Sequence, residues 1–261
     1  AGEDLNMTIK KMTFGTLLIG AGFLCISMQA SAQPVGSSAP ESFATTRVHI
    51  NEPREFSYFV RTESEFPQED PSSQNFIPGV IFGYPSRLQL AMRFIVSREE
   101  RSTFFDGFYS EGGFAFGKYG AVPLNPVAIF GISIEGFDPN ALRGMIQLSG
   151  ILNRRWVWAA NIALESTVGG YREREFLLNS GLRREISPGN LAVGGELKEV
   201  YAISDNPDAG PPHESLIGPS IVWHVNPICT LRANSLWGIS SSSPRNETTF
   251  FLEFELDCPG A

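Results

Sequence analysis

From residue 55 onward the chain alternates apolar and polar residues, in segments of about ten residues. In LQLAMRFIV, Leu88, Leu90 and Met92 share one face, while Gln89 and Arg93 share the other. Because successive side chains of a strand point to opposite faces, this period of two predicts β-strands rather than helices. Segments of this kind recur to the end of the chain, so the sequence predicts an all-β fold.

Twelve strand segments can be counted. They are residues 55–62, 76–84, 87–96, 106–118, 127–135, 141–152, 155–166, 175–186, 191–202, 215–225, 228–239 and 247–257. Tight turns at 84–86, 122–125, 153–154, 187–189 and 226–227 alternate with longer polar stretches at 62–75, 97–105, 136–140, 167–174, 204–214 and 240–246. An even strand number with alternating short and long connections is typical of a transmembrane antiparallel up-and-down β-barrel. An even strand number leaves both chain termini in the periplasm.

The alternation alone fits two kinds of barrel, because a soluble barrel buries its apolar face and a membrane barrel exposes it to lipid. The tryptophans favour the membrane: Trp156, Trp158 and Trp223 lie beside short turns and Trp237 beside a long loop, where interfacial aromatics are expected. Most segments also have about the 9 to 11 residues that cross a bilayer at a tilt. A secreted soluble β-barrel binding protein is the alternative.

The first residues predict export. From Met7 the sequence MTIKKMTFGTLLIGAGFLCISMQASA has a basic start, an apolar core and a small-residue cleavage site, which is the pattern of a secretory signal peptide. We expect residues 1–32 to be a signal peptide with a short N-terminal extension, residues 33–54 to be a periplasmic arm or plug, and residues 55–261 to be the barrel. The expected location is the outer membrane of a Gram-negative bacterium.

Charge and composition limit the partners. The 261 residues hold 28 Asp and Glu against 20 Lys and Arg, for a net charge of −8, which argues against nucleic acid. The expected partners are outer-membrane lipid and lipopolysaccharide, the barrel-assembly machinery and an unidentified small solute. No His and Cys cluster has the spacing of metal ligands, so neither a metal nor another cofactor is expected.

The polar face of the strands predicts the lining of a lumen. Its candidate residues are Gln89, Arg93, Arg143, Gln147, Asn161, Glu165, Glu196, Lys198, Arg232, Asn234, Glu253 and Glu255. Both signs of charge occur, so strong ion selectivity is not predicted. The same groups would serve equally well to pair across the lumen and fill it.

The final hairpin carries two cysteines, Cys229 and Cys258, and we expect a disulfide between them. Directly opposed strand residues lie about 4.5 to 5.5 Å apart, which a disulfide can span. That register centres the turn between Ser243 and Pro244. It places Arg232 opposite Glu255, a favourable cross-strand charge pair.

The segments FGYPSRLQLAMRF, REISPGNLAVGGEL and LIGPSIVWHVNP resemble the phenol-degradation meta-pathway (MetA-like) transporter family. The resemblance implies a non-enzymatic outer-membrane channel or transporter for small, often apolar, solutes. A structural or adhesive barrel without transport is an alternative. A second alternative is an outer-membrane lipid hydrolase, for which His213 and Ser215 are the available residues, but the spacing of histidines and serines does not predict catalysis.

Overall fold

A computed structural model gives the fold of the chain. It describes residues 44, 51, 54–67, 72–99, 102–136, 140–153, 155–169, 172–187, 189–204 and 213–257. These residues belong to one compact unit, residues 35–261. The expected signal peptide and most of the expected arm lie outside the described residues. Across the described ranges, no helix has the length and apolar character needed to span a bilayer.

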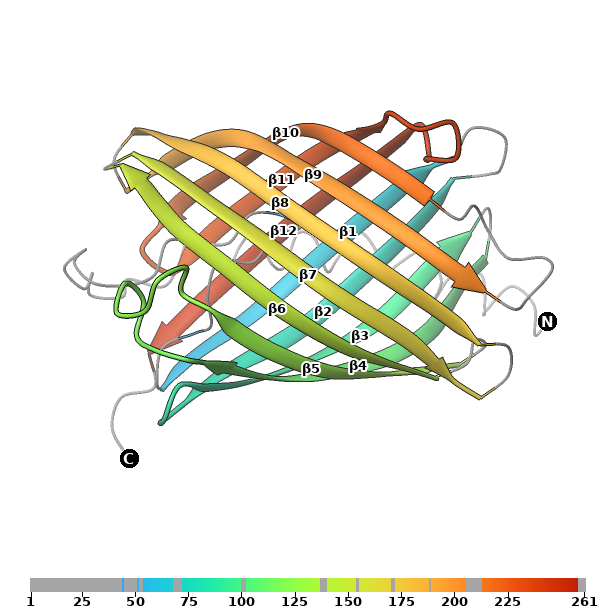
Figure 1. Ribbon diagram of the computed structural model, residues 1–261, viewed down its shortest axis with the longest axis horizontal. Helices are drawn as coiled ribbons and strands as arrows, with labels where there is room; N and C mark the ends of the chain where they lie inside the picture. The colour runs from blue at the N-terminus through green and yellow to red at the C-terminus, as the bar shows by residue number, and fades with distance from the viewer. Residues whose placement is uncertain are drawn as a thin grey trace, which may run out of the picture. The chain divides into compact units, whose positions relative to one another are not determined.

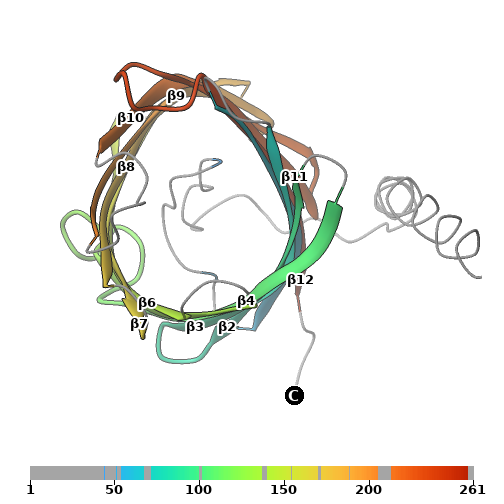
Figure 2. The same cartoon turned by 90° about the vertical axis from the view of Figure 1, so that its right-hand side faces the viewer.

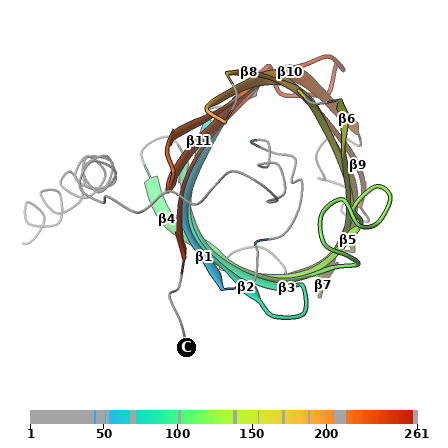
Figure 3. The same cartoon turned by 90° about the vertical axis from the view of Figure 1, so that its left-hand side faces the viewer.

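Twelve antiparallel strands close into one barrel, as the sequence predicts (Figure 1). They are β1 (Glu55–Phe66), β2 (Ser73–Tyr84), β3 (Leu88–Glu99), β4 (Ser102–Ala115), β5 (Val127–Glu135), β6 (Asn140–Asn153), β7 (Trp156–Val168), β8 (Glu173–Ser187), β9 (Leu191–Ser204), β10 (His213–Asn226), β11 (Cys229–Gly238) and β12 (Asn246–Asp257). Each strand pairs with its neighbours in sequence, and β1 pairs with β12 from Glu55 opposite Asp257 to Phe66 opposite Asn246. Views from the two ends show the resulting ring of strands (Figures 2 and 3).

The barrel is apolar outside and polar inside. In β3, Leu88, Leu90 and Met92 are exposed by 43 to 47%, whereas Gln89 between them is 4% exposed. Burial alternates in the same sense along β7 and β10. This is the arrangement that a lipid environment requires, and it is the reverse of a soluble barrel, which would bury its apolar side chains inside.

Two ends of the barrel can be distinguished. We call the end where β1 begins and β12 ends the terminal end, and the opposite end the loop end. Most strands extend two to four residues further towards the loop end than the sequence predicted; β1, for example, continues to Phe66. Most of the added residues are polar but still pair in register, as Glu63 does with Asn75. The polar stretches of the sequence therefore predicted loops that are longer than the observed ones.

The strict alternation of short and long connections is wrong at two places. Only residues 100–101 separate β3 from β4 at the loop end, where a long stretch was predicted. At the terminal end, β4 stops at Ala115 instead of continuing to Lys118, and residues 116–126 form a long turn. Asn125 N donates to Val122 O at 3.0 Å within this turn, and Ser149 N of β6 donates to Leu124 O at 2.8 Å, so the turn is folded on itself and bonded to the sheet.

The predicted register of the final hairpin is also wrong. Cys229 lies opposite Phe254, and Arg232 lies opposite Phe251 rather than Glu255, a shift of four residues along β12. Residues 239–245 form a loop that bonds to β10, with Ile239 N donating to Ser215 O at 2.8 Å, so the turn starts earlier than its Pro244 suggests. Because four is even, each side chain keeps its predicted face. Cys258 lies outside the described residues, so its disulfide stays a prediction.

Candidate channel lumen

Strand alternation puts the predicted lumen residues on the inner face. The most buried, each at most 4% exposed, are Gln89, Gln147, Asn161, Glu196, Arg232, Asn234 and Glu253. The half-buried ones are Arg93, Arg143, Glu165, Lys198 and Glu255. All have the strand parity opposite to that of the exposed apolar residues. The four tryptophans have the outer parity, with Trp156, Trp158 and Trp223 towards the terminal end and Trp237 towards the loop end.

Two inner arginines are each held by a carboxylate and an aromatic ring. Arg93 Nη2 lies 2.6 Å from Glu111 Oε2, and its guanidinium sits 4.1 Å from the centre of the Tyr109 ring. Arg232 Nη2 lies 2.5 Å from Glu253 Oε2, with both side chains at most 5% exposed. These contacts fix the positive groups to the wall.

On strands β5 to β8 the inner side chains form three successive rows. Nearest the loop end, Arg143 lies opposite Glu165 and Glu165 opposite Glu175. The next row is apolar and consists of Ile129, Met145, Ala163 and Leu177. The third row consists of the amides Gln147, Asn161 and Asn179, and it continues to Lys198 on β9. Rows are about 7 Å apart along the strands, so a solute would meet charge, then hydrocarbon, then amide.

The inner side chains of β5 to β7 differ in exposure along the barrel. Gln147 is 0% exposed and Ile129 2% exposed. Near the loop end, the Arg143 and Glu165 side chains keep 23% and 27% exposure, although they form an ion pair of 3.9 Å. On this part of the wall the inner side chains are therefore partly exposed near the loop end and buried further in.

Two described residues of the expected arm lie against the inner face. The Ala44 backbone N–H donates to Glu196 Oε1 at 3.2 Å, and the Asn51 backbone N–H donates to Gln89 Oε1 at 2.8 Å. The Asn51 side chain also donates to Ser57 Oγ at 2.7 Å. Both residues are thereby tied to the wall of the barrel.

The long turn 116–126 also reaches the inner face at the terminal end. Tyr119 packs against Val157 and Ala159 of β7, and Asn125 Nδ2 donates to Ser149 O at 3.1 Å. Burial raises the pKa of the Tyr119 phenol, while Ser149 and Arg183 act in the opposite direction. A neutral ring thus narrows this end of the lumen.

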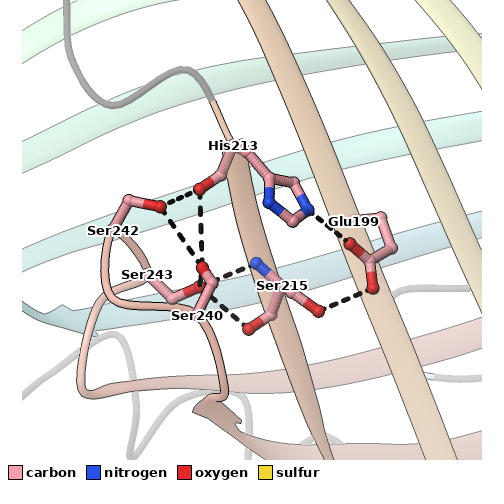
Figure 4. Close-up of polar contacts among 6 residues, drawn as sticks. All are labelled: Glu199, His213, Ser215, Ser240, Ser242 and Ser243. Atoms are coloured by element: carbon pink, nitrogen blue, oxygen red, sulfur yellow. Dashed lines mark hydrogen bonds and ion pairs between the residues drawn. The ribbon is translucent and has the colours of Figure 1, made fainter.

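The residues considered for hydrolysis do not form a nucleophile and base pair (Figure 4). Ser215 Oγ donates to Glu199 Oε1 at 2.6 Å, and His213 Nε2 lies 2.9 Å from the other oxygen of the same carboxylate. A serine nucleophile needs its base on its own hydroxyl, and His213 is instead joined to it only through Glu199. Three serines of the loop that follows β11, Ser240, Ser242 and Ser243, donate hydrogen bonds to backbone carbonyl groups of β10. This cluster holds the rim together.

Sequence reasoning missed several inner carboxylates. Glu111 holds Arg93, and Glu247 lies 2.5 Å from Lys198 Nζ. Parity along β4 and β12 places both on the same face as the predicted lining. These two carboxylates were not among the lining residues predicted from the sequence, because their cationic partners are far away in sequence. Within the described residues, no three His, Cys, Asp or Glu side chains are grouped as metal ligands.

The chain matches no known family model and no curated protein. It is similar in structure to several outer-membrane channels. The NanC porin aligns with a TM-score of 0.56 and 9% identity over 76% of this chain and 100% of that one. An outer membrane channel from Pseudomonas putida F1 aligns with a TM-score of 0.54 and 7% identity, over 87% of this chain and 100% of that one. The KdgM porin aligns with a TM-score of 0.52 and 11% identity, over 76% of this chain and 98% of that one. At these identities the likeness concerns the fold: the chain has the closed-barrel fold of outer-membrane porins.

Proposed function

We propose that this protein is an outer-membrane channel that lets small solutes pass along its lumen. The observation that carries the proposal is the inversion of the barrel, with apolar side chains outside and hydrogen-bonding side chains inside. Only a closed barrel or a helix satisfies its backbone in lipid, and a polar interior in such a barrel is typical of an aqueous path. The porin fold of the structural relatives supports the same reading.

The packed middle of the lumen argues for a narrow path. A solute must pass the apolar row Ile129, Met145, Ala163 and Leu177 and the amide row beside it. The apolar row supports the finer part of the proposal, which is that small solutes with apolar parts are carried, as the MetA-like resemblance implies. The amide row offers both donors and acceptors to polar solutes.

Reconstitution tests the proposal. The mature chain, inserted in a planar bilayer, should give discrete, small conductance steps in KCl. In cells, it should fractionate with the outer membrane and run as a heat-modifiable band, because a folded barrel migrates differently before and after boiling. The matched control is the boiled protein, which should give no steps.

Each other outcome has a definite meaning. A heat-modifiable band in the outer membrane without conductance would reject the channel and favour a structural or adhesive barrel. A soluble protein whose gel mobility is the same before and after boiling would reject the membrane location. The apolar outer face would then have to be buried against something other than lipid.

A further inference from the structure

Carboxylates dominate the inner face near the loop end. Among the described residues, nine acidic side chains lie on the inner face in this half of the barrel. Eight have the inner strand parity: Glu63, Glu65, Glu99, Glu165, Glu173, Glu175, Glu214 and Glu247. The ninth, Asp106, accepts a hydrogen bond from the inner residue Ser97. Three cationic side chains accompany them: Arg61, Arg143 and Lys198. The sequence shows both signs of charge on the polar face and did not predict this excess. The excess appears only when the inner residues are sorted by the end of the barrel at which they lie.

Two pairs of these carboxylates face each other across neighbouring strands. Glu65 lies directly opposite Glu247 on β1 and β12, and Glu165 lies directly opposite Glu175 on β7 and β8. Like charges in directly opposed positions destabilise a sheet, by up to about 1 kcal/mol relative to neutral pairs. Lys198 and Arg143 each bind one member of a pair, which leaves Glu65 and Glu175 as the carboxylates outside these two ion pairs. A positive solute in the lumen beside the pairs would relieve the remaining repulsion.

The cations of this half are already engaged by carboxylates of the same set, two of them by one member of each opposed pair. Lys198 Nζ lies 2.5 Å from Glu247, Arg143 lies 3.9 Å from Glu165, and Arg61 pairs with Glu63. The positive charge of Lys198 acts on both Glu65 and Glu214, and the negative charges of neighbouring carboxylates act on the same two residues. The field in this half therefore remains negative after the ion pairs are counted.

An oxygen ligand beside the carboxylates is also available. Thr249 lies opposite Glu63 and two residues from Glu247 on the inner face of β12. Its side chain is 0% exposed, and its hydroxyl has no hydrogen-bond partner among the described residues. Burying such a hydroxyl unpaired is unfavourable, and a cation or its hydration water would satisfy the oxygen.

We propose that the loop-end half of the lumen selects cations and cationic solutes against anions, and that the Glu65–Glu247 and Glu165–Glu175 pairs carry the selectivity. This inference rests on the proposed channel function. Rings of acidic side chains select cations in other channels because they raise the local cation concentration and repel anions. Entry at the loop end would be the selective step, since the packed middle lies beyond it.

Reversal potentials measure this selectivity directly. With the chain in a planar bilayer under a KCl gradient, we expect potassium to permeate about tenfold better than chloride at 0.1 M salt, the low end of the effect of charge-lined clefts. The ratio should fall at 1 M salt, where the Debye length shrinks to about 3 Å.

The test variant is Glu65→Gln with Glu175→Gln. It removes one carboxylate from each opposed pair and leaves the ion pairs of Lys198 with Glu247 and of Arg143 with Glu165 in place. We expect the permeability ratio to fall at least threefold. Because the substitution relieves repulsion, the heat-modifiable band should persist; the single variants serve if the double variant does not fold. The control is Glu199→Gln, which removes a carboxylate from the outer face and should leave the ratio unchanged.

Three results would overturn the inference: a reversal potential near zero, one that favours chloride, or a ratio that the double variant keeps. A conducting channel with any of these results leaves the proposed function intact. A folded barrel that never conducts would instead reject the channel itself, and the selectivity with it.

Discussion

At the scale of single residues, similar ion pairs in this barrel differ greatly in their surroundings. Arg232 and Glu253 are at most 5% exposed and lie 2.5 Å apart. Arg143 and Glu165 are about a quarter exposed and lie 3.9 Å apart. The loss of one partner leaves a buried charge in the first case and a hydrated one in the second. Burial, more than the number of ion pairs, determines which residues the fold depends on.

Replacing Arg232 with Met should therefore lower the free energy of unfolding by about 3 to 5 kcal/mol, because Glu253 remains buried without its partner. The contact of Arg232 with the Phe251 ring, 4.8 Å from its centre, would be lost as well. Urea unfolding of the barrel in lipid vesicles measures the change.

Arg143→Met is the matched control, and it should cost roughly 0 to 1 kcal/mol. The double variant Arg232→Met with Glu253→Leu should recover much of the loss, since no charge is then left buried. Equal effects of the two arginine substitutions would contradict this account.

At the scale of strands, the sequence predicted what depends on parity and missed what depends on register. All twelve strands and their inner and outer faces follow from a period of two. The pairing of Cys229 with Phe254 does not follow, because a shift of two or four residues leaves every face unchanged. The loop of residues 239–245 fixes the register of the hairpin, because it bonds to β10; for example, Ser243 Oγ donates to Ser215 O at 2.9 Å. No local pattern in the hairpin reveals a contact with a third strand.

Cross-linking can test the register of the hairpin. In a Cys258→Ser background, Phe254→Cys places a second thiol directly opposite Cys229, within the distance that a disulfide spans. Mild oxidation should give a band that moves on reduction. Leu256→Cys, two residues further on the same face, is the control and should cross-link poorly.

The unmodified protein addresses the predicted bond between Cys229 and Cys258. Its gel mobility should shift on reduction, and Cys258→Ser should abolish that shift. A protein without any shift would remove the disulfide from the description and leave the observed register untouched.

At the scale of the whole molecule, the contacts of Ala44 and Asn51 join the arm to the barrel wall. If the arm narrows the path, weakening these contacts should widen it. We expect Gln89→Ala with Glu196→Ala, which removes both acceptors, to raise the single-channel conductance severalfold. The loss of a lumen carboxylate would by itself reduce cation current, so a rise could not come from the change of charge.

Asn179→Ala is the control for that experiment. Asn179 lies on the same inner face, and its substitution removes a comparable side chain without removing an acceptor of Ala44 or Asn51. If both variants raise the conductance equally, the effect is one of volume, and the arm does not narrow the path.

The pairing of β1 with β12 has a consequence for the order of events in the life of the protein. The first strand pairs with β2 on one edge, but its partner on the other edge exists only when residues 246–257 have been made, almost two hundred residues later. Until then the sheet has two unpaired edges and an apolar outer face in water, which is the condition under which sheets aggregate. Synthesis and closure are therefore separate in time, and the interval between them is when the chain is most exposed to aggregation.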